Sequence, residues 1–211
     1  MECGTGLQKI AVSEGTIQPT DESVRKSFNT TSGGLNEVVL NHYGLILLHG
    51  FGFPLKGLNS FIEKRVSAKD DAQNITENAG LQNYLDRFCN TNLIINLALQ
   101  IRKEVSTPIY VSMAPMWSIL EKRSDAQKYE SIEQYGAQVK NMFIEKVTRF
   151  LEAHDIGLIQ QPQGTLEDDY FTKEEFIMGY STNNIRDFGH MNREYGEIAL
   201  SNMMDTALLH A

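Results

Sequence analysis

The chain has 211 residues, of which 41% are hydrophobic and 22% are charged, so it can bury one sizeable core. We therefore expect a single domain over residues 1–211. A formal net charge of −8 argues against binding to nucleic acid or to anionic membranes, because both partners favour a basic surface. No apolar run approaches the roughly 20 residues that cross a bilayer.

The cysteines and histidines are too sparse to indicate a disulfide framework or a metal site. Cys3 and Cys89 are the two cysteines, and the first residues lack the basic segment and apolar core of a signal peptide. We therefore expect a cytoplasmic protein. The five histidines show no metal-ligand spacing, and Gly50 and Gly52 lack the third glycine of a dinucleotide fingerprint. Neither a metal nor a cofactor is predicted.

The first part of the chain predicts short strands separated by glycine turns. Residues 7–13 alternate weakly, and residues 37–40 also resemble a strand. Residues 29–34 read as a loop, because their paired glycines allow a positive φ. The continuous apolar run 44–49 predicts a strand covered on both faces, and the loop 50–54 ends it.

The rest of the chain alternates between amphipathic helices and apolar strands. Helices are expected over 79–105, 131–153 and 192–209, and strands over 109–114 and 156–159. The first helix should break near residues 90–92, where Thr91 could cap a second helix, and Thr172 should cap a short turn. The residues of the last helix expected to face inward are Tyr195, Ile198, Ala199, Met203 and Leu208.

This alternation is typical of a parallel sheet with helices on both faces. We expect an α/β fold, a three-layer α/β/α sandwich of the flavodoxin-like type, with four or five parallel strands. Ligands of such folds bind beyond the carboxyl ends of the strands. The loops expected at that edge are 31–34, 49–54, 115–118, 160–162 and 187–190. Glycines, hydroxyl groups and an Asp/His pair should therefore converge there.

The Asp/His pair lies near the end of the chain, where Asp187 precedes His190 by three residues. An aspartate at this spacing can accept a hydrogen bond from Nδ1–H of the imidazole, which leaves Nε2 free to act as a base. The alternative is structural, with Asp187 capping the last helix and His190 in its first turn. The spacing alone leaves both interpretations open.

Four blocks of the chain, between about residues 29 and 209, resemble the SGNH hydrolase superfamily of GDSL-type esterases and acyl-transferring enzymes. The strongest match is residues 187–192 with Tyr195-Gly196, which resemble the family's terminal D-x-x-H block. The weaker matches are residues 29–34 with its glycine block, residues 44–53 with its third block, and residues 109–115 with a strand ending in proline.

The resemblance implies an enzyme that hydrolyses or transfers the acyl group of a small or carbohydrate-linked ester, without a cofactor. His190 would be the general base and Asp187 its orienting group. Backbone N–H groups of the glycine loops would bind the oxyanion, each contributing on the order of 3 kcal/mol. The residues so implied are Gly33, Gly34, Gly50 and Gly52. His49 could line the same site or could bond to backbone at the strand end.

Two departures from the family pattern leave the activity open. Gly52 stands where the family has an oxyanion-binding Asn, so that donor is missing or replaced by a backbone N–H. The serine nucleophile, expected at or before Met1, is not visible. The chain could be shortened and lack that serine, could use Cys3 or Ser13, or could be a non-catalytic binding module. Neither the substrate nor the oligomeric state can be read from the sequence.

A second resemblance, to α/β-hydrolases, rests on the His-Gly segment of residues 48–52. That family also needs a Gly-x-Ser-x-Gly elbow between a strand and a helix. The nearest candidate, residues 179–183, ends in Asn and leaves no room for further strands before Asp187. We therefore favour the SGNH interpretation.

Overall fold

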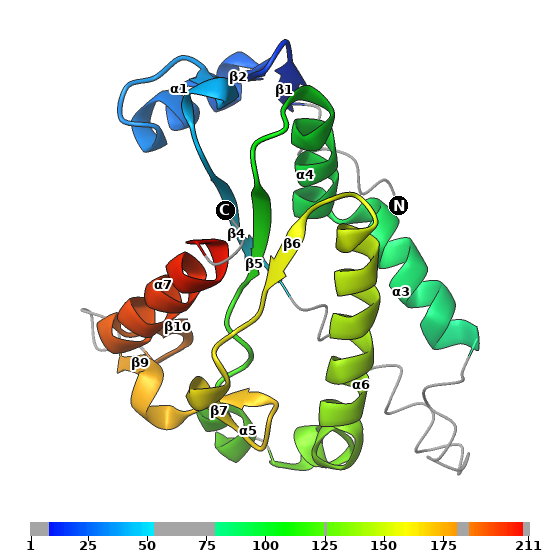
Figure 1. Cartoon of the computed structure of the whole chain (residues 1–211). Helices are drawn as coiled ribbons and strands as arrows, with labels where there is room; N and C mark the ends of the chain where they lie inside the picture. The colour runs from blue at the N-terminus through cyan, green and yellow to red at the C-terminus, as the bar shows by residue number, and fades with distance from the viewer. Residues whose placement is uncertain (1–8, 53–78, 125, 181–185, 209–211) are drawn as a thin grey trace.

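The computed structural model describes residues 9–52, 79–124, 126–180 and 186–208 of a mixed α/β protein (Figure 1). Its central sheet is parallel, with strand order β4–β5–β6. The strands are β4 (Ile46–Phe51), β5 (Ile109–Met113) and β6 (Gly157–Ile159). All three were expected from their apolar runs. In the described residues this sheet has three strands, not the four or five predicted.

A small antiparallel unit adjoins the amino ends of these strands. It contains β1 (Ile10–Ser13), β2 (Thr16–Pro19), α1 (Glu22–Thr31), β3 (Val38–Val39) and the 3-10 turn η2 (Leu40–His42). The backbone N–H of Gly15 donates to Glu104 at 3.2 Å, and that of Ile46 donates to the Pro108 carbonyl at 2.9 Å. The Gly15 contact holds the unit close to the residues that precede β5, at the top of Figure 1, whereas the Ile46 bond joins the start of β4 to the residue before β5.

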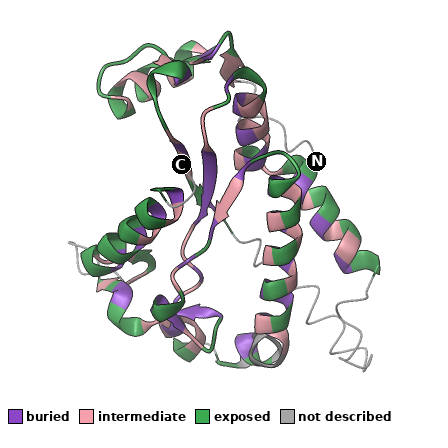
Figure 2. Cartoon of the chain, viewed as in Figure 1, coloured by how far each residue is buried: buried purple, intermediate pink, exposed green. Residues whose placement is uncertain are grey.

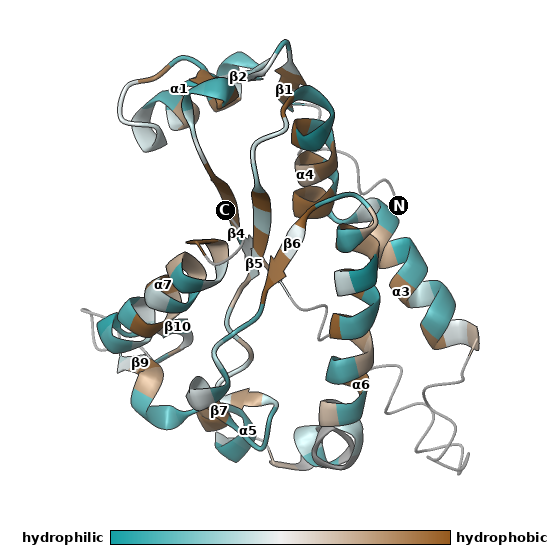
Figure 3. Ribbon diagram, viewed as in Figure 1, coloured by the Kyte–Doolittle hydropathy of each residue, from teal (hydrophilic) through white to brown (hydrophobic). Residues whose placement is uncertain are grey.

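One face of the parallel sheet is covered by three helices. They are α3 (Ala79–Thr91), α4 (Leu93–Glu104) and α6 (Ala126–Glu152), and the short α5 (Ile119–Ser124) precedes α6. Ile109, Val111 and Met113, alternate residues of β5, belong to the core cluster on this face. Figures 2 and 3 show the buried and apolar residues gathered on the central strands and on the helix faces beside them.

The break between α3 and α4 lies where it was expected, but the capping residue is Asn92. Its side-chain oxygen accepts the backbone N–H groups of Ile94 at 3.0 Å and Ile95 at 3.2 Å. The Thr91 hydroxyl instead donates to the carbonyl of Arg87, one turn back in α3. Thr91 therefore ends the first helix and does not start the second.

The final helix α7 (Arg193–Leu208) covers the opposite face, where Tyr110 and Ile159 meet Tyr195, Ala199 and Met203. The buried stripe continues to Ala207, because steps of four residues keep side chains on one side of a helix. The prediction that Ile198 and Leu208 face inward was wrong, since they are 36% and 64% exposed.

The direction of α7 is opposite to that of the strands. Asn202 donates to the carbonyl of Gln160, just beyond the carboxyl end of β6. Thr206 lines a cavity with Pro108 and Gly157, at the amino ends of β5 and β6. The start of α7 and the residues before it therefore lie toward the carboxyl ends of the strands (Figure 1).

The segment between β6 and α7 forms two hairpins that the sequence did not predict. β7 (Leu166–Glu167) pairs with β8 (Phe171–Thr172), and β9 (Ile177–Tyr180) pairs with β10 (Arg186–Met191). The 3-10 turn η4 (Gln163–Thr165) precedes β7, and the 3-10 turn η5 (Glu174–Phe176) lies between β8 and β9. Thr172 does not cap η5, because its hydroxyl donates to the Met116 carbonyl at 2.7 Å.

The close contact between Gly157 and Tyr110 predicts a large effect of a single methyl group. A Cβ at residue 157 would lie 2.3 Å from Cδ1 of the Tyr110 ring. We expect Gly157→Ala to lower the free energy of unfolding by about 1–3 kcal/mol, measured by urea denaturation.

Gly196→Ala is the matched control, because a Cβ there meets nothing within 4 Å and the residue lies within α7. It should leave stability unchanged or raise it by up to about 1 kcal/mol. Equal stability of Gly157→Ala and wild type would contradict the packing of Tyr110 against residue 157.

Candidate functional site

The Asp187–His190 pair lies in an irregular part of β10. Asp187 is opposite Gly179 and Met191 is opposite Ile177, so β10 takes four residue steps where β9 takes two. The extra residues bulge out of the ladder, and bulges commonly re-aim side chains beside functional sites. The Asp187 carboxylate accepts the backbone N–H of His190 at 3.2 Å, which closes this bulge.

The same carboxylate contacts the imidazole of His190. Nδ1 lies 2.8 Å from Oδ1 and 2.9 Å from Oδ2 of Asp187. A carboxylate accepts only, so Nδ1 carries the proton and Nε2 of the neutral ring presents a lone pair. The His190 side chain is 79% exposed and that of Asp187 is 20% exposed, which leaves Nε2 accessible to a substrate.

The structural alternative for Asp187 is wrong, because another residue caps α7. The side-chain oxygen of Asn192 accepts the backbone N–H of Tyr195 at 3.0 Å, and its amide donates to the Glu175 carbonyl. His190 therefore lies before the helix, in β10. Asn192 fixes the start of α7, and the Asp187 carboxylate contacts His190 instead of the helix.

The hydrogen bond from His190 lowers the pKa of the Asp187 carboxyl below its ordinary value, with smaller contributions from the His190 charge and nearby backbone N–H groups. Because the pKa of Asp187 is lower in the folded than in the unfolded state, its ionised carboxylate stabilises the fold at pH values above the unfolded-state pKa. That contribution disappears as the pH falls through the folded-state value.

His49 and Gly50 lie at the carboxyl end of β4, as expected. The pairing of β4 with β5 shifts between His49 and Phe51, so Gly50 is an extra residue at φ +100°. One inserted residue reverses the alternation of side chains. Phe51 consequently joins the core on the α3/α6 face, with its ring 5.5 Å from Phe88.

Among the described residues, the hydrogen-bond partner of His49 is not a backbone group but the hydroxyl of Ser112, the residue opposite it in β5. Nδ1 of His49 lies 3.2 Å from Oγ of Ser112. Ser112 is 1% exposed and His49 is exposed. Sequence reasoning missed Ser112, although a serine inside the apolar strand 109–113 was a signal that its hydroxyl needed a partner.

Gly33 and Gly34 are not part of this edge, and their expected place there was wrong. They follow α1 in the antiparallel unit beside the amino ends of the parallel strands (Figure 1). Their φ angles are +72° and +98°, and the Gly34 N–H donates to the Asn29 carbonyl at 2.7 Å. Paired glycines end a helix as readily as they line a loop, and here they end α1.

Candidate nucleophiles remain apart from the pair or lie outside the described residues. Ser13 ends β1 in the antiparallel unit, at the opposite end of the sheet from His190. Cys3 and Ser181 lie outside the described residues, and so does the loop from Phe53. Cys89 is buried, and desolvation raises the pKa of its thiol, which favours an inert core residue.

A buried polar network joins the loops that follow β5 and β6. The side-chain oxygen Oε1 of Gln161 accepts the backbone N–H of Met116 at 2.7 Å, and the side-chain amide of Gln161 donates to the hydroxyls of Thr165 and Thr172. Those hydroxyls in turn donate to the carbonyls of Pro162 and Met116. Because each of these buried polar groups has a hydrogen-bond partner, the network holds the loops at this end of the sheet in a rigid arrangement.

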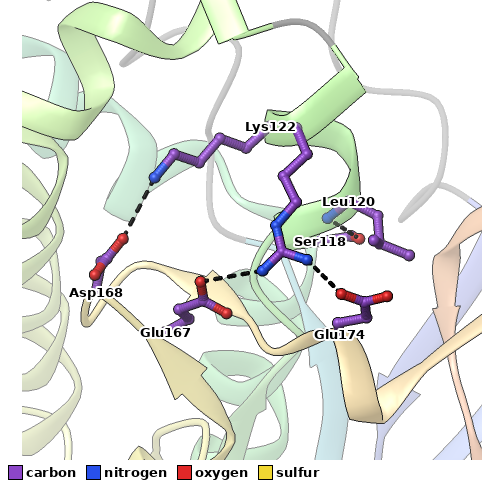
Figure 4. A network of polar contacts seen from close by, with 7 residues as sticks. Ser118, Leu120, Lys122, Glu167, Asp168 and Glu174 are labelled. Atoms are coloured by element: carbon purple, nitrogen blue, oxygen red, sulfur yellow. Dashed lines mark hydrogen bonds and ion pairs between the residues drawn. The ribbon is translucent and has the colours of Figure 1, made fainter.

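The acidic hairpin turn of residues 167–169 is paired with basic side chains of α5. The Lys122 ammonium lies 3.3 Å from the Asp168 carboxylate, and the neighbouring Arg123 contacts Glu174 and Glu167 (Figure 4). Ser118 caps α5 by accepting the Leu120 N–H at 3.0 Å. These partly exposed ion pairs contribute little stability individually, but they dock the hairpin onto α5.

Two cavities lined by described residues lie away from the Asp187–His190 pair. One of about 420 Å³ opens at the amino ends of β5 and β6, beside Arg102 and Asp155. Another of about 20 Å³ lies under Lys140 and Gln161. Within the described residues, no three potential metal ligands gather, and no helix has the length and apolarity to cross a bilayer.

Comparison with known proteins finds no family model, curated protein or solved structure that matches this chain.

The Gln161 network predicts a strong effect of removing one amide. Gln161→Met keeps the side-chain length but leaves the buried N–H of Met116 without its acceptor. We expect it to lower the free energy of unfolding by about 1–3 kcal/mol in urea denaturation. Gln163→Met is the control, since Gln163 contacts Asp169 in an exposed position. Equal effects of the two substitutions would contradict the role of the network.

The Asp187 carboxyl should titrate below the ordinary range of aspartate, as followed by carboxyl ¹³C NMR. His190→Gln should move the Asp187 pKa upward, because it removes the Nδ1–H donor that is the main cause of the lowering. His154→Gln is the control, since His154 bonds to the Phe150 carbonyl in α6. An unchanged Asp187 titration in His190→Gln would show that the pair does not form.

Proposed function

We propose that the chain is an SGNH-type enzyme that hydrolyses or transfers the acyl group of a small or carbohydrate-linked ester. The observation that carries the proposal is the contact of His190 Nδ1 with both carboxylate oxygens of Asp187, in a ring that is 79% exposed. We also propose that the fold is the three-layer sandwich of that superfamily. The parallel sheet, with helices packed on both of its faces, supports this part of the proposal. It also includes action in the cytoplasm.

The chemistry follows from the tautomer of His190. Its Nε2 lone pair takes the proton of an attacking hydroxyl or thiol, and the resulting imidazolium is stabilised by Asp187. The nucleophile adds to the ester carbonyl, whose oxygen becomes negative. The imidazolium then returns the proton to the leaving alcohol, so that no cofactor is needed.

The oxyanion would be bound at the carboxyl end of β4. Gly50 and Gly52 flank the buried Phe51 there, and neither glycine has a side chain that would obstruct a substrate. Gly33 and Gly34 have no part in this version of the site. The proposal therefore retains His49, Gly50 and Gly52 from the sequence-based set.

A non-catalytic binding module is the second candidate, and one specific observation favours it. Ser13, the serine considered from the sequence, lies in the antiparallel unit at the other end of the sheet. A pair without a nucleophile would bind an ester or a carboxylate but turn nothing over at a useful rate.

Hydrolysis of p-nitrophenyl acetate separates the two candidates. We expect His190→Ala and Asp187→Asn to lower kcat/KM by on the order of 10²–10⁴-fold, through loss of the base and of its orienting group. His154→Ala, which changes an exposed histidine in the turn after α6, should behave as wild type. Activity that survives in His190→Ala would refute the proposed base.

Mass spectrometry of the chain after incubation with the same ester identifies the nucleophile. An acetylated peptide that requires His190 supports the enzyme and locates the attacking residue. Absence of both turnover and acetylation in the wild-type chain supports the binding module instead.

A further inference from the structure

The His49–Ser112 contact connects an exposed ring to a buried hydroxyl. His49 is at the end of β4 and Ser112 is its direct partner in β5, on the face that α7 covers farther along the sheet. Ser112 is buried, so its hydroxyl has no access to solvent. The contact of 3.2 Å with His49 Nδ1 is the hydrogen bond that the structure gives this hydroxyl among the described residues.

The number of protons at this contact decides the tautomer of His49. A hydroxyl has one proton to donate, and a buried donor without an acceptor is strongly disfavoured. If Nδ1 carried the ring proton, the Ser112 proton would have no acceptor among the described residues. Ser112 therefore donates to Nδ1, and the proton of the neutral ring lies on Nε2.

The two exposed imidazoles thus have opposite tautomers. His190 gives its Nδ1 proton to Asp187 and presents a lone pair at Nε2. His49 accepts at Nδ1 and presents an N–H at Nε2. His49 is near the carboxyl end of β4, and β10, which carries His190, lies toward the same end of the parallel sheet. Addition to an ester carbonyl uses one group of each kind, a base for the nucleophile and a donor for the carbonyl oxygen.

We propose that His49 is a neutral hydrogen-bond donor that binds the carbonyl oxygen of the ester through Nε2–H, and that Ser112 is the positioning residue that fixes this tautomer. His49 gives up no proton, and its hydrogen bond strengthens as negative charge develops on the oxygen. The bulge at Gly50 supports this role, because it sends Phe51 into the core and leaves His49 exposed beside it.

The assignment of the ligand rests on the proposed function, whereas the tautomer does not. The tautomer is measured first, by long-range ¹H–¹⁵N NMR of the whole chain at a pH where imidazoles are neutral. We expect wild-type His49 to carry its proton on Nε2, and Ser112→Ala to show both tautomers. Ser201→Ala, which changes an exposed serine of α7, should match wild type. A proton on Nδ1 of wild-type His49 would overturn the proposal.

The donor role is measured with p-nitrophenyl acetate. His49→Leu should lower kcat by about 100-fold or more with little change in KM, because the lost bond is strongest in the transition state. His49→Gln, which keeps a side-chain N–H, should recover at least about tenfold of that loss. A kcat for His49→Leu within twofold of wild type would refute the donor role.

The experiments give different results if the proposed enzymatic function is wrong and if only the donor role of His49 is wrong. If wild type does not hydrolyse the ester but His49 carries its proton on Nε2, the proposed enzymatic function and the ester as ligand of His49 are both refuted. The role of Ser112 in fixing the His49 tautomer would still hold. Loss of activity in His190→Ala but not in His49→Leu would keep the enzyme and remove His49 from its site. Urea denaturation of each variant shows whether a loss reflects unfolding.

Discussion

The parallel pairing of β4 with β5, interrupted by one extra residue, determines what reaches the carboxyl end of the sheet. Gly50 adopts φ +100°, where a side chain would be strained, and it reverses the alternation of β4. Phe51 then packs with Phe88 and Phe143 under α3 and α6. A regular strand would turn Phe51 toward the α7 face, on the side of His49. A single glycine thus separates a core aromatic residue from an exposed imidazole.

Other contacts make this end of the sheet a defined surface. Gln161 connects the loops after β5 and β6, and the antiparallel course of α7 carries Asn192 and the preceding β10 toward the same end. Asn192 donates to Glu175 while it caps α7, so the helix start is tied to η5. The Asp187–His190 pair therefore precedes a helix whose start is fixed on both sides, which suits a group that must meet a substrate repeatedly.

Helices and strands were predictable from the sequence where buried apolar residues recur at a regular spacing. The apolar strand 109–113, the helices α6 and α7, and the break between α3 and α4 all followed from that period. Features that depend on distant partners were not predictable. Paired glycines end α1 instead of lining the site, and β10 exists because it pairs with β9. Ser112 acquires its meaning only from His49, which lies 63 residues earlier.

Sequence separation distinguishes the two imidazoles in a way that bears on folding. His190 and its carboxylate are three residues apart, so their contact closes a very short loop at small entropic cost. The His49 contact closes a loop of 63 residues and needs β4 and β5 already aligned. The Asp187–His190 contact is local and forms when β10 forms. The His49–Ser112 contact instead requires the parallel sheet to be assembled. Partial loosening of the central strands would therefore disable the His49–Ser112 contact first.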